Sequence, residues 1–188
     1  MFDTSLSQRS SIKHEYSLLL GAIIQRSKGI LLTDHLFDHA FKMIEKYPFL
    51  REVSTPVYQD TTGIVPYNFF AICALYHQDF PSVTDKFNGL HKPFRPMIDV
   101  LLSEDITRAR MLLKHGFEIV KDCGFCIYCK HDERFNYGEL DLIDVLIEHN
   151  KHESIRFIQD VISKEILLKR DEMACYGKYK YCDIFKIL

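Results

Sequence analysis

Apolar residues in the first quarter of this chain recur at the three- and four-residue intervals that place them on one face of an α-helix. Two such stripes precede Pro48, which is expected to end the second helix. Thr33 or Asp34 precedes the second stripe and has the side-chain oxygen that caps a helix start. The first stripe, over residues 12–26, contains Tyr16, Leu19, Leu20, Ile23 and Ile24, and the second contains Leu36, Phe37, Ala40, Phe41 and Ile44.

An internal similarity marks the second half of the chain. The tetrapeptide Ile-Asp-Val-Leu stands at residues 98–101 and again at 143–146. Around each copy, residues 96–117 and 141–162 align without a gap as a short apolar helix, a polar turn and a second apolar helix. One helix pair of this size cannot bury its own apolar face, so similar pairs stack on each other. The similarity predicts a mainly α-helical protein built as a short helical-repeat solenoid.

Several residues fix the expected ends of the helices in the first of these blocks. Pro96 suits a first helical turn, Asp105 is a candidate cap, and Gly116 supplies the left-handed residue that ends a helix. Helical character is also expected at residues 68–76, with a weaker segment at 82–87, whereas 51–67 is expected to be a long connection. For residues 171–188 the choice between helix and strand stays open.

The spacing of apolar residues changes at the end of the first block, from a helical interval to every second position. Phe117 and Ile119, and then Phe125, Ile127 and Cys129, alternate with polar or smaller residues on either side of Gly124. Alternation of this kind across a glycine-containing turn predicts a β-hairpin. We therefore expect a β-hairpin and loop insertion around residues 117–138.

One segment resembles a known family. The sequence Met-Leu-Leu-Lys-His-Gly-Phe at 111–117 is similar to the end of the second helix of an ankyrin repeat, and Ala109 matches the small residue where the two helices approach. Residues 142–149 and 155–158 look like a more degenerate copy. The resemblance implies a protein-binding module without catalytic residues.

The chain also departs from the ankyrin pattern. The Thr-Pro-Leu-His signature of the first helix is missing, and the copies lie 45 positions apart (98 to 143), against about 33 in ankyrin repeats. A helical array unrelated to ankyrins is the alternative.

Composition and charge narrow the possible functions. The 188 residues are 47% hydrophobic, enough for a core, and their net charge of −2 gives no electrostatic argument for binding nucleic acid. The N-terminus has no secretory signal pattern, and the most apolar early stretch, 18–24, is too short to cross a membrane. We expect a flexible segment at 1–10, a single domain over 11–188, and a cytoplasmic or nuclear location without a membrane or nucleic-acid partner.

Cys123, Cys126 and Cys129, with His131 close behind, form the sharpest chemical motif. A Cys-x-x-Cys turn presents two thiolates to one metal ion, and Cys175 or Cys182 would complete a zinc site from a distance. In a strand, however, alternate cysteines point to opposite faces. Structural thiols are the favoured reading, ahead of zinc and of an iron–sulfur or redox centre.

Two histidine patterns are candidate metal sites, and a structural role is favoured for both. His35 and His39 lie four residues apart, but the glutamate of a zinc-peptidase motif is absent between them. The polar run at 149–153 falls at a turn between helices, where solvated side chains are expected.

We therefore expect a non-enzymatic protein-binding module, an adaptor or a regulator, with no cofactor and no metal; the alternative is a small helical module supported by zinc at Cys123, Cys126 and Cys129. A longer repeat protein could contain this chain as a fragment. The connection at 51–67 is a second candidate contact surface. Aromatic residues and arginine dominate protein-binding hot spots, and the 117–138 insertion offers Phe125, Tyr128, Arg134, Phe135 and Tyr137.

Overall fold

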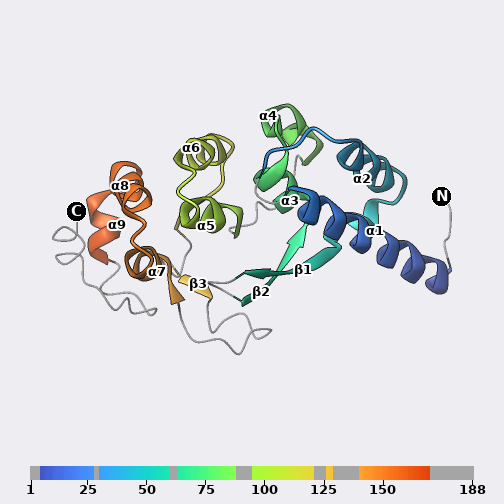
Figure 1. Cartoon of the computed structure of the whole chain (residues 1–188), viewed down its shortest axis with the longest axis horizontal. Coiled ribbons are helices and arrows are strands. Elements are labelled where there is room, and N and C mark those ends of the chain that lie inside the picture. The colour runs from blue at the N-terminus through green and yellow to red at the C-terminus, as the bar shows by residue number, and fades with distance from the viewer. Residues whose placement is uncertain are drawn as a thin grey trace. The chain divides into compact units, whose positions relative to one another are not determined.

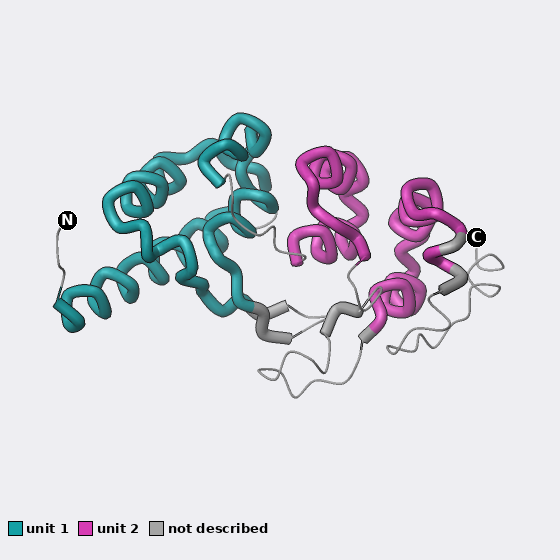
Figure 2. Tube along the Cα trace, turned by 180° about the vertical axis from the view of Figure 1, so that it is seen from behind, with its two compact units in different colours: residues 1–93 teal, residues 94–188 magenta. Residues whose placement is uncertain are grey.

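The computed structural model of the chain is mainly helical, with two small two-stranded antiparallel sheets (Figure 1). It describes residues 5–27, 30–59, 63–87, 95–120, 126–128 and 140–169. The chain forms two compact units, residues 1–93 and residues 94–188 (Figure 2). The single domain expected over 11–188 stays a prediction.

The first unit combines helices with one β-hairpin. Its elements are α1 (Leu6–Ser27), α2 (His35–Lys46), the 3₁₀ helix η1 (Pro48–Glu52), β1 (Ser54–Gln59), β2 (Gly63–Asn68), α3 (Phe69–Tyr76), α4 (Phe80–Val83) and the 3₁₀ helix η2 (Thr84–Phe87).

Helix α1 begins six residues before the predicted start at residue 12, so residues 6–10, expected to be flexible, are helical. The backbone N–H of Arg9 donates to the Ser5 carbonyl, and the Ser5 hydroxyl accepts a longer bond of 3.4 Å from the Gln8 N–H. Serine at a helix start supplies such acceptors to unpaired backbone N–H groups. Apolar periodicity does not mark this turn, because its side chains are exposed.

The predicted second helix is confirmed as α2. The Asp34 carboxylate caps it by accepting from the Leu36 N–H at 3.1 Å. The same carboxylate, only 4% exposed, lies 2.9 Å from Arg26 Nε and 2.7 Å from His35 Nδ1. Asp34 therefore joins the end of α1 to the start of α2.

Residues 51–67, expected to be a connection, contain the end of η1 and most of a β-hairpin. Strands β1 and β2 pair antiparallel, with Pro56 opposite Pro66. Neither proline has an N–H to exchange, so this pair suits a position in the ladder without hydrogen bonds. Pro56, Gly63 and Pro66, together with few periodic apolar positions, predict a connection here. Prolines placed opposite each other, however, do not interrupt the pairing.

Helix α3 is the centre of the first unit. Seven of its eight residues, Phe69 to Leu75, are buried, and the Asn68 side chain caps it by accepting from the Ala71 N–H at 2.9 Å. A helix that is apolar on every side has to be covered on every side. Helix α1 and strand β2 contact α3 directly, and the rings of Phe37 and Phe41 from α2 lie against Phe69.

The second unit contains two helix pairs. Its elements are α5 (Arg95–Leu102), α6 (Ile106–Lys114), β3 (Cys126–Tyr128), β4 (Leu140–Asp141), α7 (Leu142–Glu148), α8 (His152–Val161) and α9 (Lys164–Lys169). Helix α5 packs on α6 and α7 on α8, while α5 contacts α7 and α6 contacts α8. Residues 162 and 163 separate α8 from α9.

The first helix of each pair ends with the same backbone motif. Glu104 (φ 57°) and Asn150 (φ 54°) are left-handed. The N–H groups of Asp105 and Lys151, one residue later, bond back to the carbonyls of Val100 and Leu146. This pattern is a Schellman motif, in which glycine or asparagine usually takes the left-handed position.

The two motifs correct the gapless alignment of the blocks. Glu104 and Asn150 are 46 positions apart (104 to 150), whereas the Ile-Asp-Val-Leu copies are 45 apart (98 to 143). The second pair therefore has one more residue at the end of its first helix. Gly116 ends α6 in the same way, as predicted, with φ 79° and a bond from the Phe117 N–H to the Leu112 carbonyl.

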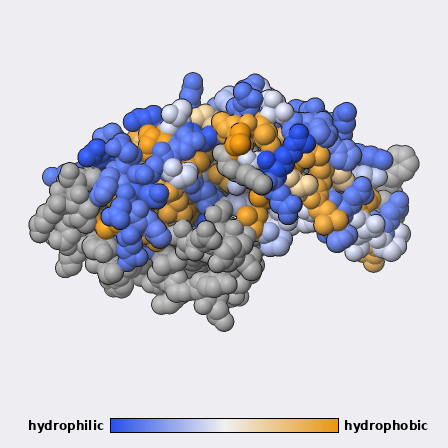
Figure 3. All heavy atoms as spheres, in the orientation of Figure 1, coloured by the Kyte–Doolittle hydropathy of each residue, from blue (hydrophilic) through white to orange (hydrophobic). Residues whose placement is uncertain are grey.

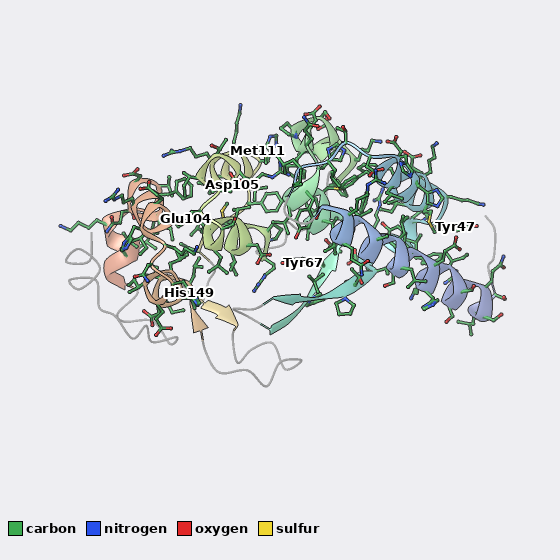
Figure 4. All side chains as sticks on the ribbon, viewed as in Figure 1. Tyr47, Tyr67, Glu104, Asp105, Met111 and His149 are labelled. Atoms are coloured by element: carbon green, nitrogen blue, oxygen red, sulfur yellow. The ribbon has the colours of Figure 1, made fainter. Side chains whose placement is uncertain are left out.

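Polar groups connect the two pairs (Figure 4). The Glu104 carboxylate accepts from the Glu153 N–H at 3.1 Å, in the first turn of α8, and lies 4.0 Å from Lys151 Nζ. Helix α8 has no side-chain cap from its own N-cap residue, Lys151. The buried Ser154 hydroxyl donates to the Leu101 carbonyl at 2.6 Å. The first pair therefore caps and anchors the second helix of the next pair.

The hairpin predicted within residues 117–129 is wrong, because its two segments do not pair with each other. Residues 117–120 are not in a strand, and Phe117 and Ile119 are both buried. Strand β3 instead pairs with β4, placing Tyr128 opposite Leu140. The alternation at Phe117 and Ile119 therefore reflects burial of both side chains and does not come from strand structure.

We predict that Ser154→Ala lowers the free energy of unfolding by about 1 kcal/mol, because it removes a buried hydrogen bond. Urea unfolding followed by circular dichroism measures the change. Ser11→Ala, at an exposed position within α1, is the control and should change stability by less than about 0.5 kcal/mol. Equal effects of the two substitutions would contradict a role for the Leu101 contact.

We predict that Tyr16→Phe is neutral or stabilising by about 1 kcal/mol at neutral pH, since a buried hydroxyl without a partner costs free energy. Tyr16 is fully buried, and none of the described residues accepts a hydrogen bond from its hydroxyl or donates one to it. Urea unfolding measures the change, with Tyr47→Phe as the control at a half-buried ring.

The pH dependence gives a second readout of the same substitution. Burial, with a smaller contribution from nearby Cys73, raises the pKa of Tyr16 well above its ordinary value of 10.0. The unfolded chain therefore releases this proton first, and stability falls by about 1.4 kcal/mol per pH unit once the pH passes 10. Tyr16→Phe should lose this component. An unchanged alkaline slope would show that Tyr16 does not cause it.

Candidate binding site

Phenylalanine rings from three elements of the first unit meet beside α3. Phe69 lies edge-on to Phe41 of α2, with ring centroids 4.8 Å apart. Phe70 stacks on Phe87 of η2 at 4.4 Å, with 17° between the ring planes. Phe87 also lies 5.8 Å from Phe41. The four rings form a continuous aromatic cluster, in the offset and edge-to-face arrangements that aromatic pairs prefer.

A cavity of about 300 Å³ opens over this cluster. Its floor is formed by the same rings, together with Ile44 of α2. Each floor side chain is buried, with at most 8% of its surface exposed. The floor is therefore part of the hydrophobic core, and a ligand would contact the core through this opening.

Charged residues surround the cavity. Glu45 comes from α2, Arg51 from η1, and Asp85 and Lys86 from η2. All four are exposed. Within the part of the chain that the structure describes, none of them forms an ion pair within 4.0 Å. The Lys86 ammonium instead lies 4.2 Å from the centroid of the Phe41 ring, a distance typical of a cation–π contact.

This arrangement is suited to binding. A pocket with an apolar floor and a few polar groups at its edge holds a ligand by burial and fixes its orientation by charge. Its size is at the lower end of the range of about 300–1,000 Å³ for ligand pockets, which suits one side chain or a similarly small group.

The sequence indicated only part of this pocket. Phe41 and Ile44 belong to the second predicted stripe, and Phe69 and Phe70 to the predicted helix at 68–76. None of these residues was selected as a site. The spacing of phenylalanines at 41, 69–70 and 87 gives no local motif, because the pocket depends on three elements that meet only in the folded chain.

Of the predicted contact residues, Phe125, Arg134, Phe135 and Tyr137 lie outside the described residues. The backbone of Tyr128 lies in β3, opposite Leu140 of β4. Asp141, next to Leu140, caps α7 by accepting from the Ile143 and Asp144 N–H groups at 2.9 and 3.2 Å. The predicted contact segment is therefore followed, at Asp141, by a capped helix start.

Most of the proposed zinc ligands lie outside the part of the chain that the structure describes. Cys123, Cys129, Cys175 and Cys182 lie outside the described residues, whereas the backbone of Cys126 is in β3 and Cys73 is buried in α3. His35 pairs with Asp34. No group of three or more potential metal ligands occurs among the residues that are described. The zinc alternative stays a prediction.

The surface offers few other features. In the view of Figure 3, hydrophilic residues predominate and hydrophobic ones form separate patches. Among the described helices, none has both the length and the apolar character to cross a membrane. Among the residues that the structure describes, the large exposed hydrophobic ones are Leu6, Leu18, Ile30, Leu31 and Val161.

No protein-family model matches the chain, and no curated protein or solved structure does. The resemblance to ankyrin repeats therefore rests on the sequence motif alone.

We predict that Phe87→Ala lowers the free energy of unfolding by about 3–5 kcal/mol, because it leaves a void in the aromatic cluster. Lys86→Met, one residue away at the edge of the pocket, should change it by less than about 1 kcal/mol. Urea unfolding of both variants measures the difference. Similar losses in the two variants would show that the rim is as structural as the floor, and binding tests should then avoid both.

Proposed function

We propose that this chain is a non-enzymatic protein-binding module, an adaptor or regulator built on ankyrin-like helical repeats. The observation that carries the proposal is the packing of α5/α6 against α7/α8, first helix on first helix and second on second. Equivalent contacts between successive helix pairs are the defining property of helical-repeat arrays, and such arrays present extended surfaces to partners.

The contacts of Glu104 and Ser154 support this interpretation. Both connect one pair to α8 of the next, so neither pair completes its own polar interactions. The first pair satisfies groups at the start of a helix in the second, as expected for units that are stable only when stacked. The similar turns at Glu104 and Asn150 add a shared backbone geometry.

Within this proposal the partner contacts the segment between β3 and β4. Strand pairing holds the start and the end of that segment beside one another. A rigid scaffold that presents a connecting segment is a common arrangement for recognition. Of the contact residues proposed from the sequence, three belong to this segment, one ends β3 and one directly precedes β3. They are, in that order, Arg134, Phe135 and Tyr137, then Tyr128, then Phe125.

We predict that alanine at these five positions reduces partner capture by tenfold or more, since removing aromatic and arginine hot spots costs more than about 1 kcal/mol each. The full-length chain and the variant are used as baits in a cell extract, and the captured proteins are quantified by mass spectrometry. Circular dichroism checks that both baits have the same helix content.

The matched control carries Lys114→Ala and Asp160→Ala, at exposed positions of α6 and α8 in the same unit. A partner kept by the control and lost by the five-residue variant supports the proposal. A partner lost only by the control would place the contact on α6 and α8 and contradict the proposed segment. Metal analysis of the same bait tests the zinc alternative, which requires stoichiometric zinc.

A further inference from the structure

We infer that the pocket beside α3 binds a cationic side chain of the partner, an alkylammonium or a guanidinium, and that Lys86 occupies the site when no partner is bound. This inference rests on the proposed function, because the cation is taken to belong to a bound protein. It adds a second contact, in the first unit, and specifies its chemistry.

The first support is the position of the Lys86 ammonium. It lies 4.2 Å from the centre of the Phe41 ring, closer than the other cation–π contacts of the described residues, which range from 5.0 to 6.0 Å. The face of an aromatic ring carries negative potential and attracts cations. The pocket thus already holds a positive group, supplied by its own rim.

The second support is the charge balance of the rim. With Lys86 in place, two cations (Arg51 and Lys86) face two carboxylates (Glu45 and Asp85), so the rim is neutral. If Lys86 turns outward, one cation faces two carboxylates, and the net charge is −1. A monovalent cation restores neutrality.

The two carboxylates of the rim are available to bind a cation. Neither Glu45 nor Asp85 has an ion-pair partner among the described residues. A cation over the rings would therefore gain charge-assisted contacts with these carboxylates without breaking an ion pair of either one.

An anion fits less well. It would be attracted by Arg51 and Lys86, but it would lie against the negative faces of the rings and beside two carboxylates. The apolar floor would also remove water from it without offering hydrogen bonds. The cavity, at about 300 Å³, is small for a nucleotide or cofactor and suits a single side chain.

A ligand in this pocket would compete with Lys86 for the Phe41 ring. A ligand has to displace the Lys86 ammonium from Phe41, so part of its binding free energy is spent on that exchange. Removing the ammonium should therefore tighten binding of an external cation. This expectation separates a ligand site from a merely structural contact.

The test uses the full-length chain and three small probes that differ in charge. Nα-acetyl-lysine amide is the cation, its Nε-acetylated form is a neutral probe, and Nα-acetyl-glutamate amide is the anion. Binding is measured by titration in ¹H–¹⁵N correlation spectra, which locate the site as well as the affinity.

We expect the cation alone to bind, with shifts at Phe41, Phe87 and their neighbours. Lys86→Met should tighten its binding about two- to fivefold, the equivalent of an exposed cation–π contact. Glu45→Gln and Asp85→Asn should each weaken it about two- to fivefold. Lys42→Met, which removes an exposed lysine of α2 outside the pocket lining, is the matched control and should leave affinity unchanged.

Equal binding of the neutral probe, preference for the anion, or an unchanged affinity after Lys86→Met would overturn the inference. The probes need no protein partner, so their result is independent of partner capture. Binding of the cation without any captured partner would refute the proposed function and keep the site. A partner captured without binding of the cationic probe would support the proposed function and refute the cation site.

Discussion

The burial of α3 on all sides is the constraint on which the first unit depends. Seven of its eight residues are buried, so neighbouring elements have to cover the whole circumference of this short helix. Large aromatic side chains from α1, α2, α4 and η2 supply that cover: Tyr16, Phe37, Phe41, Phe80 and Phe87. The candidate pocket forms where α2, η1 and η2 meet over the rings and only long charged side chains remain to close the opening. The site is thus a consequence of how the core is covered.

The second unit depends on polar contacts more than on ring packing. Glu104 takes a left-handed conformation in which a residue other than glycine or asparagine is strained. Its carboxylate accepts from the first turn of α8, and a glycine at this position would lack that acceptor. The strain and the contact belong together: one residue ends α5 and caps a helix in the next pair. This explains why a glutamate stands where a Schellman motif usually has glycine.

The two proposed surfaces would present a binding site in different ways. In the first unit, a charged rim over a buried aromatic floor would select a ligand by the charge of a single group, with Lys86 competing for the same place. In the second, stacked helix pairs would provide a frame, and β3 and β4 lie at the two ends of the intervening segment. The first surface would be specific because few groups fit, and the second because many contacts act together. The proposed module would use both on one partner.

The sequence by itself determined the local elements whose signals lie within a few residues. Periodic apolar stripes gave α2, α5 and α6, and the caps at Asp34 and Asp105 and the left-handed Gly116 were identified from residue type alone. It also determined that two similar helix pairs follow one another. These features depend on backbone groups and side chains that are neighbours in the chain.

Only the tertiary structure decided the rest. Strand β3 pairs with β4 and not with residues 117–120, because strand partners are chosen by long-range contact. The hairpin β1–β2 forms despite its prolines because they lie opposite each other, a match that neither proline reveals alone. The pocket combines residues 41–51 with 69–70 and 85–87, and Lys86 meets Phe41 across a separation that no local pattern encodes. Local propensity depends on a few adjacent residues, whereas pairing, coverage and pockets depend on which distant surfaces the folded chain brings into contact.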